Sequence, residues 1–462
     1  MKKWISIFIT LLLNLMIVAC GNEAVSETGN DAHEQKENET AMVSEVLGKK
    51  ESANVKDSDK QKEGLEVYYV TGDYASVKLI SWFQEEHPEI KLNKVLFSKT
   101  EDMDAQLAAI SGTGKGPDVV LFPNTTTLNV EKMALGGSFA DLLPMLEADP
   151  EYDENNYYPV LNSGYINGKQ LLMPLRIDCH YMISSKGKIQ NAGIDISTIS
   201  SLMQGLREAV KGAGAEACAM LGGVDVYTWL RITGVDILDI EEEEISISRE
   251  VMQEYASFAQ TRCMEYDKVD QVRTLYNNDF IQSFPLWTGL VTNGSMPFIM
   301  RTMDTYMKVG VEDQLQIVTY PNYEDSDTIT ADVLLYAAVM EDSEEKALAY
   351  TFVRTLMDGG LASNIKDIPI SKAGTAQLLD DLSKYGGKTF SAGSMEITVQ
   401  QMTPELRAEC EAILNKISAG SIRNHALENI ITETMEPYIL GEADFDSCYA
   451  KFKNQVEIYL YE

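Results

Sequence analysis

The feature of this sequence that most restricts its fold is an alternation of strand-like and helix-like segments over 65–122. The apolar run at 65–70 predicts a short strand, and the apolar residues that follow recur at helical spacing until His87-Pro88 ends the helix. The same reasoning predicts a strand at 90–97, a helix at 101–111 and a strand at 118–122. This order predicts a parallel sheet covered by helices, and therefore an α/β fold.

The chain is long and strongly acidic. Its 462 residues exceed the usual length of one domain and suit two packed lobes. It holds 71 acidic and 38 basic residues, a net charge of −33 for the whole chain, and a protein this acidic is repelled by phosphate backbones, so we expect no nucleic-acid partner. With four histidines and no CxxC spacing, the sequence also predicts no metal site and no cofactor.

Two short motifs resemble chemical motifs, but their contexts argue against catalysis. The glycine-rich stretch at 112–116 ends a predicted helix and enters a strand, whereas a phosphate-binding loop follows a strand and opens a helix. Cys179 and His180 are neighbours in a predicted strand, so their side chains point to opposite faces. No Gly-x-Ser-x-Gly elbow occurs in the sequence. We therefore expect a protein that is not an enzyme.

The cysteine content argues against a disulfide framework. Beyond Cys20 the cysteines are odd in number and none is in CxxC spacing. Cys410 and Cys448 could pair, but we predict buried free thiols instead.

The first twenty residues predict export. Lys2 and Lys3 precede an apolar run at 4–19, which is too short to span a membrane as a helix. The run ends in Ile17-Val18-Ala19-Cys20, which resembles a bacterial lipobox. That resemblance implies a signal peptide at 1–19, cleavage before Cys20, and a diacylglycerol joined to the Cys20 sulfur by a thioether, whose two acyl chains, such as palmitate, hold a soluble protein on the membrane. The alternative is an ordinary secretory signal with a chance cysteine.

A polar segment follows the lipobox. Residues 21–63 are rich in Glu, Asn, Lys, Ser and Asp and contain no aromatic residue. Such a composition cannot bury enough surface to offset the entropy of ordering the chain. We expect 20–63 to be a lipidated cysteine with a disordered tether.

Several short stretches, taken in order, resemble one family. They are 70–73 with 83–90, 116–121 with 140–142, 168–174 with 181–183, 293–298, and 343–347 with 368–370. Behind a lipobox, this order is similar to the family 1 extracellular solute-binding proteins of ABC importers, which include sugar-binding proteins. The chain departs from the family at Gly294-Ser295-Met296-Pro297, where Ala-Ala-Met is common, and at 301–303, where an aromatic residue is common.

The resemblance implies a two-lobed α/β fold of the periplasmic-binding-protein type, with a hinge and an interlobe cleft. We expect a first lobe of 64–175 plus 336–368 and a second lobe of 176–335 plus 369–462. The expected crossings between the lobes lie near 175–179, 330–336 and 368–372.

Candidate ligand contacts in the first lobe lie in two loops. Ligands of open α/β sheets bind at the carboxyl ends of the strands, which independently selects the loops at 71–74 and 123–126. In these loops the resemblance assigns ligand contacts to Asp73, Tyr74, Asn124 and Thr125. The alternative for Asp73, Asn124 and Thr125 is capping of the helix that follows.

Further candidates lie in a crossing strand and in the second lobe. Arg176 and Asp178 are one residue apart in a strand, so their side chains share a face and could grip a polyol or a carboxylate. The alternative is a hinge salt bridge without a ligand. In the second lobe the resemblance assigns contacts to four residues, Asp225, Tyr227, Trp229 and Arg301, whose aromatic members would pack on sugar rings. Trp229 could instead belong to a helix core.

These expectations together describe a binding protein on the extracellular face of a bacterial cell membrane. It would capture a solute, a sugar or oligosaccharide in the first place, by hinge closure and deliver it to an ABC permease. The expected partners are the small-molecule solute, the permease subunits and the membrane, and we expect a monomer. The alternatives are a non-sugar solute on the same scaffold, a ligand sensor, and a carbohydrate-active surface enzyme.

Overall fold

The structure is a computed structural model, and it describes most of the chain after residue 63. The described residues are 64–185, 193–211, 220–221, 225–260, 291–295, 315–323, 327–358, 367–384, 389–392, 395–398 and 404–461. The expected signal peptide, Cys20, the expected tether and Arg301 lie outside them.

The predicted strand and helix alternation is confirmed. Strands β1 (Leu65–Val70), β2 (Leu92–Phe97) and β3 (Val119–Pro123) alternate with helices α3 (Tyr74–Glu86) and α4 (Thr100–Ile110). Both β2 and β3 pair with β1 in parallel. Helix α3 ends at the position predicted for it, since His87 is its C-cap residue. Strand β3 is buried along its whole length, and β1 is buried at all but one position, as expected for a sheet covered on both faces.

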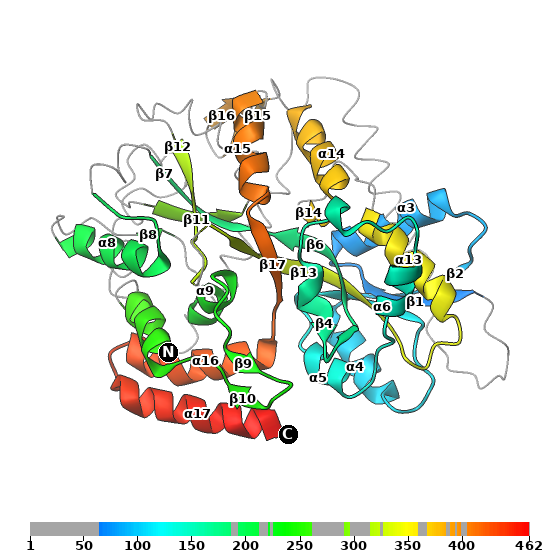
Figure 1. Cartoon of the computed structure of the whole chain (residues 1–462), viewed down its shortest axis with the longest axis horizontal. Helices are drawn as coiled ribbons and strands as arrows, with labels where there is room; N and C mark the ends of the chain where they lie inside the picture. The colour runs from blue at the N-terminus through cyan, green and yellow to red at the C-terminus, as the bar shows by residue number, and fades with distance from the viewer. Residues whose placement is uncertain are drawn as a thin grey trace. The chain divides into compact units, whose positions relative to one another are not determined.

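The sheet is mixed rather than wholly parallel, because a later strand enters its middle. Strand β13 (Ile329–Val339) pairs antiparallel with β3 and with β6 (Met173–Asp178), and parallel with β17 (Ile417–Ile422). Strand β14 (Ile368–Pro369) pairs antiparallel with β6 at the edge. The resulting seven-stranded sheet runs β14-β6-β13-β3-β1-β2, with β17 beside β13 (Figure 1). Two antiparallel steps make β6 parallel to β1 and β3, so all three strands end at the same edge of the sheet.

The first hydrophobic core forms around this sheet. Its buried residues come from 65–181 and 329–422. Helix α13 (Lys346–Asp358) packs on α3, where the rings of Phe83 and Phe352 meet edge to face with centroids 4.7 Å apart. The remaining helices of this part of the chain are α5 (Val130–Leu135), α6 (Leu143–Ala148), α14 (Lys372–Ser383) and α15 (Pro404–Leu414).

A second core forms beside a smaller sheet. Strands β12 (Leu315–Thr319), β7 (His180–Ser185), β11 (Val291–Ser295) and β8 (Met220–Leu221) are neighbours in that order. The helices α8 (Ile199–Lys211), α9 (Val226–Ile232), α16 (His425–Ile439) and α17 (Phe445–Tyr461) contribute residues to this core, and α16 and α17 lie side by side in Figure 1. Other strands form short two-stranded antiparallel sheets: β4 (Tyr165–Ile166) with β5 (Lys169–Gln170), β9 (Leu238–Asp239) with β10 (Glu244–Ile245), and β15 (Thr389–Ala392) with β16 (Met395–Thr398).

The described residues show the chain passing between the two cores at three places. These lie between Tyr181 and Ile194, between the end of β12 and the start of β13, and between Ile422 and Leu427. The expected boundaries put 369–462 in the second lobe. In the structure, Ile370, Leu378 and Cys410 lie in the first core, and the second core resumes at Leu427.

The cysteines that the structure describes agree with the prediction of buried thiols. Cys179, Cys410 and Cys448 are buried and form no disulfide, while Cys218 and Cys263 lie outside the described residues. Cys410 lies in the first core and Cys448 in the second, which explains why they do not pair.

The described residues contain neither a membrane-spanning helix nor a metal-binding cluster. None of the helices in this part of the chain is both long enough and apolar enough to cross a bilayer. The same residues contain no group of three or more His, Cys, Asp or Glu side chains that could hold a metal ion.

Candidate functional site

The candidate site lies at the edge of the large sheet where β1, β3 and β6 end. Asp73 follows β1, Asn124 and Thr125 follow β3, and Arg176 and Asp178 are the last polar residues of β6. The topology therefore brings five of the predicted residues to one edge. Crevices for ligands in open α/β sheets form at this type of edge.

Asp73 is the N-cap residue of α3. Its carboxylate accepts hydrogen bonds from the backbone N–H groups of Ala75 and Ser76, each at 3.2 Å, and from the hydroxyl of Ser76. Burial raises the pKa of Asp73, while these hydrogen bonds and the charge of Arg176 oppose the rise. The expected alternative, helix capping, therefore describes what this side chain does here. Tyr74 begins α3, and its side chain is outside the described residues.

Arg176 is a fully buried cation with unused donors. Its Nη1 donates to the carbonyl oxygen of Leu175 at 2.7 Å, and the side chain has 0% exposure. Among the described residues, its Nε and Nη2 atoms have no hydrogen-bond partner. Burial lowers the pKa of Arg176 to about 10, and the charges of Asp367 and Asp73 oppose that effect. The guanidinium therefore stays charged, and its two unused donors lie on one edge of the planar group, the arrangement that fits two oxygen atoms at once.

Asp178 lies opposite a second carboxylate. Asp178 and Asp332 are directly paired in the β6–β13 ladder. Burial raises the pKa of Asp178 to about 7, helped by the charges of Asp367 and Asp332 and opposed by His180. Its Oδ1 accepts a hydrogen bond from the backbone N–H of Cys179 at 2.7 Å. A carboxyl group in this environment changes charge near neutral pH.

Asp332 is held by a residue of the second core. Arg231 of α9 donates from Nη1 and Nη2 to the two carboxylate oxygens, at 2.5 and 2.9 Å, and His180 Nε2 lies 3.4 Å from Oδ2. Burial alone would raise the pKa of Asp332, but Arg231 and His180 hold it well below its ordinary value. We call Asp178, His180, Arg231 and Asp332 the crossing cluster. Sequence reasoning missed His180, Arg231 and Asp332 as members of this cluster, and Arg231 and Asp332 come from parts of the chain far from Asp178.

The loop after β3 is fixed on both sides. The backbone N–H of Asn124 donates to the carbonyl oxygen of Leu334 at 2.8 Å, and its own carbonyl oxygen faces His425 Nε2 at 3.0 Å. Thr125 is exposed, with its hydroxyl 2.9 Å from that of Thr100. The next residue of the loop, Thr126, donates from its hydroxyl to the buried carboxylate of Asp104 on α4, at 2.7 Å. The loop therefore presents Thr125 from an anchored backbone.

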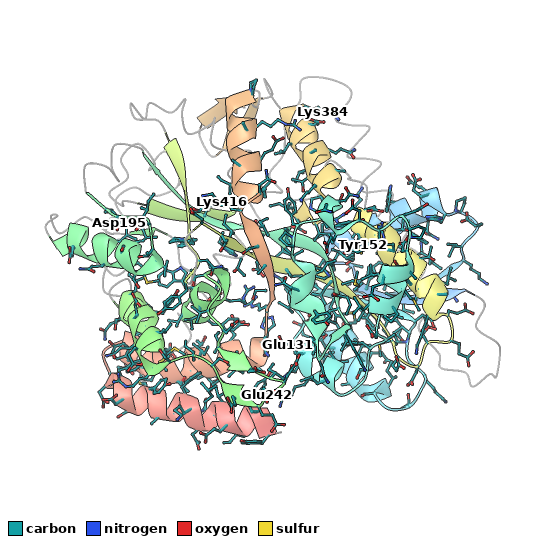
Figure 2. All side chains as sticks on the ribbon, in the orientation of Figure 1. Glu131, Tyr152, Asp195, Glu242, Lys384 and Lys416 are labelled. Carbon is teal, nitrogen blue, oxygen red and sulfur yellow. The ribbon has the colours of Figure 1, made fainter. Side chains whose placement is uncertain are left out.

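Next to this loop, α5 meets the start of α16 and the end of α17. Asn424 Nδ2 donates to Glu131 at 3.0 Å and to the hydroxyl of Tyr459 at 2.7 Å. Asn129 also bonds to that hydroxyl, and Lys132 bonds to the carbonyl oxygen of Tyr459. Burial raises the pKa of Glu131, which Figure 2 labels at this place. We call these five residues the α5–α16 contact. Like the crossing cluster, it joins elements of the two cores.

The predicted residues of the second core lie on or before α9. Asp225 is exposed and caps the helix, accepting from the backbone N–H of Thr228 at 2.8 Å. Tyr227 is 2% exposed, and its hydroxyl accepts from the backbone N–H of Asn424 at 2.6 Å. Trp229 has 0% exposure and packs on Phe258 with ring centroids 4.7 Å apart. In this conformation both aromatic rings belong to the second core, and Arg231 is the residue by which α9 reaches the edge of the sheet.

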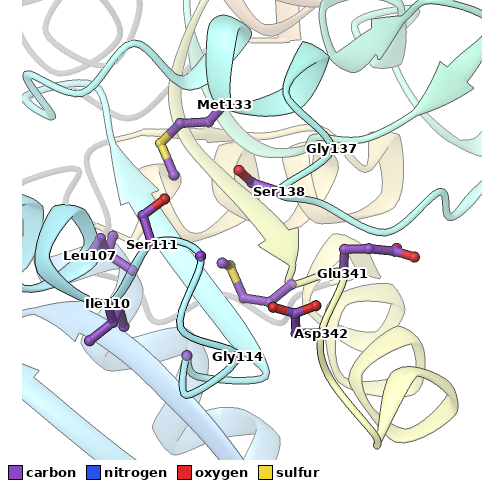
Figure 3. Close-up of a pocket in the computed structure, with 12 residues that line it drawn as sticks. Leu107, Ile110, Ser111, Gly114, Met133, Gly137, Ser138, Glu341 and Asp342 are labelled. Atoms are coloured by element: carbon purple, nitrogen blue, oxygen red, sulfur yellow. The ribbon is translucent and has the colours of Figure 1, made fainter.

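The glycine-rich stretch lies at the opposite edge. Gly112, Gly114 and Gly116 line a pocket of about 60 Å³ with Met340, which follows the end of β13 (Figure 3). Figure 3 shows Leu107 and Ile110 on one side of this pocket and Glu341 and Asp342 on the other. Gly112 and Gly114 have φ values of +73° and +65°, a backbone conformation that favours glycine. This turn between α4 and β3 accounts for the glycines without a phosphate ligand.

Solved structures of binding proteins are similar to this chain over most of its length. The sugar-binding protein MalE from Xanthomonas citri is 14% identical, with a TM-score of 0.61 and coverage of 86% of this chain and 97% of that chain. A family 1 extracellular solute-binding protein from Alicyclobacillus acidocaldarius is 12% identical, with a TM-score of 0.56 and coverage of 87% and 100%. An ABC substrate-binding protein from Listeria monocytogenes in complex with cycloalternan is 15% identical, with a TM-score of 0.52 and coverage of 86% and 99%.

These likenesses establish the fold. The chain has the two-lobed, mixed α/β fold of periplasmic binding proteins, as its resemblance to the family 1 solute-binding proteins implied. No family model matches the sequence, and no curated protein matches it either. The likeness therefore lies in the arrangement of the chain and not in its sequence.

Proposed function

We propose that this protein is a solute-binding protein of an ABC importer that captures a sugar or oligosaccharide outside the cell. The fold supports this proposal, because similar structures include a sugar-binding protein and a substrate-binding protein in complex with cycloalternan. The ligand would lie at the carboxyl edge of the large sheet, against residues of the second core. Binding both cores at once favours the closed arrangement, and the closed state is then handed to the permease.

The observation that carries this proposal is the free edge of Arg176. A buried cation with unused N–H groups is costly, because each missing hydrogen bond leaves a donor that has lost its water. Within the described residues, Nε and Nη2 of Arg176 are in this situation. Two neighbouring hydroxyl oxygens of a sugar can accept from such an edge. The nearby carboxylates of Asp178 and Asp367 would disfavour an anionic group, so a neutral sugar is the better match.

The same geometry favours binding over catalysis. Glycosidases act with two carboxyl groups that flank the scissile bond. Here Asp332 is occupied by the guanidinium of Arg231 through two hydrogen bonds, and Asp178 lies directly across the ladder from it. One of the two carboxylates is therefore not available to a substrate.

The proposal can be tested with a thermal-shift screen over neutral mono- and oligosaccharides, followed by calorimetry. A ligand at a hundred times its Kd stabilises the folded protein by about 2.7 kcal/mol, which raises the melting temperature measurably. The sugar should be recovered unchanged after prolonged incubation. If a polyamine, peptide or organic phosphate stabilises the protein and no sugar does, the sugar assignment is wrong; release of a cleaved product would instead support an enzyme.

The proposal includes a lipid anchor at Cys20 and a location on the outer face of the cell membrane. It is supported by the sequence Ile17-Val18-Ala19-Cys20. A diacylglycerol joined to the Cys20 sulfur by a thioether carries two acyl chains, and with about 0.8 kcal/mol per buried methylene these hold a soluble protein on a bilayer. Labelling cells with a clickable fatty acid should mark the wild-type protein and leave Cys20→Ser unmarked. An unmarked wild-type protein would contradict the anchor and leave the binding proposal untouched.

A further inference from the structure

His425 makes two contacts that require the same chemical role from both of its ring nitrogens. It is the first residue of α16, and its side chain is 19% exposed. Its Nε2 lies 3.0 Å from the carbonyl oxygen of Asn124, and its Nδ1 lies 3.2 Å from Oε2 of Glu428. A carbonyl oxygen and a carboxylate only accept hydrogen bonds. Both nitrogens must therefore donate, and only the doubly protonated imidazolium has two N–H groups.

The charged groups around the His425 ring act on the imidazolium in opposite directions. Burial would raise the pKa of Glu428, but hydrogen bonds from His425 and Arg423 lower it to about 2, so this carboxylate remains ionised. Arg423 and the amino end of α16 both oppose a positive charge on the ring. Glu428 is thus the group that favours the imidazolium. The other titratable groups that the packed elements bring to this place are Glu131, Lys132, Asp225, Tyr227, Arg231 and Tyr459.

We propose that His425 is a proton-dependent tie between the second core and the loop that follows β3. With both nitrogens protonated, the ring joins the start of α16 to the backbone of Asn124. When one proton leaves, a lone pair replaces one of the two N–H groups, and one of the two contacts becomes repulsive. The Nδ1–H group faces a full negative charge and is the better retained of the two. The contact that is lost is therefore the one to Asn124.

The tie gives the proposed site a dependence on pH. The Asn124–Thr125 loop lies at the edge where we place the solute, so loosening it at high pH would weaken solute binding. That consequence rests on the proposed function, whereas the tie itself does not. Losing one charge-assisted hydrogen bond should reduce the population of the joined conformation roughly tenfold.

Nitrogen NMR of the histidine rings tests the tie directly in the full chain without any solute. The sequence has four histidines, so replacing each in turn assigns the signals. At pH 5.5 both nitrogens of His425 should carry protons, and the shift of Nε2 should show that it donates. At a pH high enough to remove one proton from the ring, Nε2 should be bare while Nδ1 keeps its proton. A His425 ring that carries a single proton at pH 5.5 in the folded protein would overturn the proposal.

A distance measurement tests the consequence. Fluorophores placed at Glu147 on α6 and Lys453 on α17, which are both exposed, report the separation of elements from the two cores. The wild-type distance distribution should change between pH 5.5 and 8.5, and that of His425→Gln should not. The matched control is His87→Gln, since His87 is bonded to Glu89 away from α16, and it should behave as the wild type does. The variant Glu131→Gln removes another titratable group at this place, and its pH response should remain that of the wild type. A pH response that survives His425→Gln would contradict the tie; such a result leaves the sugar screen unaffected.

Discussion

The two regions that join the cores hold them in different ways. In the crossing cluster, the side chains of Arg231 and Asp332 are 6% and 7% exposed and share two hydrogen bonds. Both the guanidinium and the carboxylate stay charged at any ordinary pH. The α5–α16 contact consists of individual hydrogen bonds, one buried and three partly buried, with no ion pair among them, and the His425 tie beside it needs a proton. A buried ion pair is costly to break, whereas single hydrogen bonds that water can replace are not. If the two cores move relative to each other as the proposed function requires, we expect the crossing cluster to stay joined and the α5–α16 contact to open.

The largest effect is expected for Asp332→Ala. Removing this carboxylate leaves the guanidinium of Arg231 buried without its partner, and such a loss typically destabilises by about 3–5 kcal/mol. Urea unfolding measures it. The control is Asp446→Ala, which removes the partner of Arg249 from an exposed pair and should change little. Equal, small losses for both variants would show that the crossing cluster is not the firm attachment.

Asp178→Asn is expected to stabilise the protein at high pH, whereas Asp332→Ala destabilises it. Burial raises the pKa of Asp178 from 3.8 to about 7, so the folded state holds its proton more tightly than the unfolded state does. The stability that this proton contributes is complete below about pH 4 and is lost as the pH rises through 7. At pH 8 the variant should be more stable than the wild type by roughly 2–4 kcal/mol, and at pH 4 the two should agree. Thermal melts over this range measure the difference. A constant difference at all pH values would exclude titration of Asp178.

The next effect concerns the ligand and not the fold. Arg176→Lys keeps the positive charge and removes the pair of donors on one edge, so the Kd for the identified sugar should rise ten- to a hundredfold, or roughly 1.5–3 kcal/mol. Calorimetry measures this change. Arg407→Lys, an exposed substitution on α15, is the matched control and should leave the Kd unchanged. Unchanged affinity in Arg176→Lys together with a lower melting temperature would make Arg176 a structural residue.

The smallest effect is expected for Tyr459→Phe in the α5–α16 contact. The change removes a hydroxyl that bonds to Asn424 and Asn129, and the typical cost of one such bond is about 1 kcal/mol. The interprobe distances described above should shift toward separated cores, with little change in urea stability. Tyr461→Phe, with the same chemistry on a side chain that is 74% exposed, should have no effect. A stability loss as large as that of Asp332→Ala would erase the difference between the two regions.

Sequence reasoning worked where the information is local. The spacing of apolar residues located β1, α3, α4 and β3 within a residue or two, because each element is defined by its own short segment. Asp73 caps α3, which was the alternative stated for it from the local sequence. Asp225 caps α9, which is a common use of an aspartate. The carboxyl-edge rule also placed the loops after β1 and β3 together.

The rest of the site depends on pairing between distant segments. Asp332 meets Asp178 because β13 enters the sheet beside β6, and Arg231 joins them from α9. Nothing in the residues around 178, 231 or 332 indicates that these three are neighbours. The aromatic residues Tyr227 and Trp229 present a related difficulty, because a short apolar helix does not reveal which of its faces is covered by another core.

The central position of β13 bears on how the chain acquires its structure in the first place. Strands β3 and β6 both pair with β13 and not with each other, and β13 begins at Ile329, long after β6 has ended at Asp178. The last strand, β17, also adds to β13. Contacts between residues so far apart close late, since the entropy of large loops must be overcome first. The large sheet therefore stays unfinished until most of the chain has emerged. We expect such a chain to stay unfolded longer than one built from local contacts, which suits the export that its first twenty residues predict.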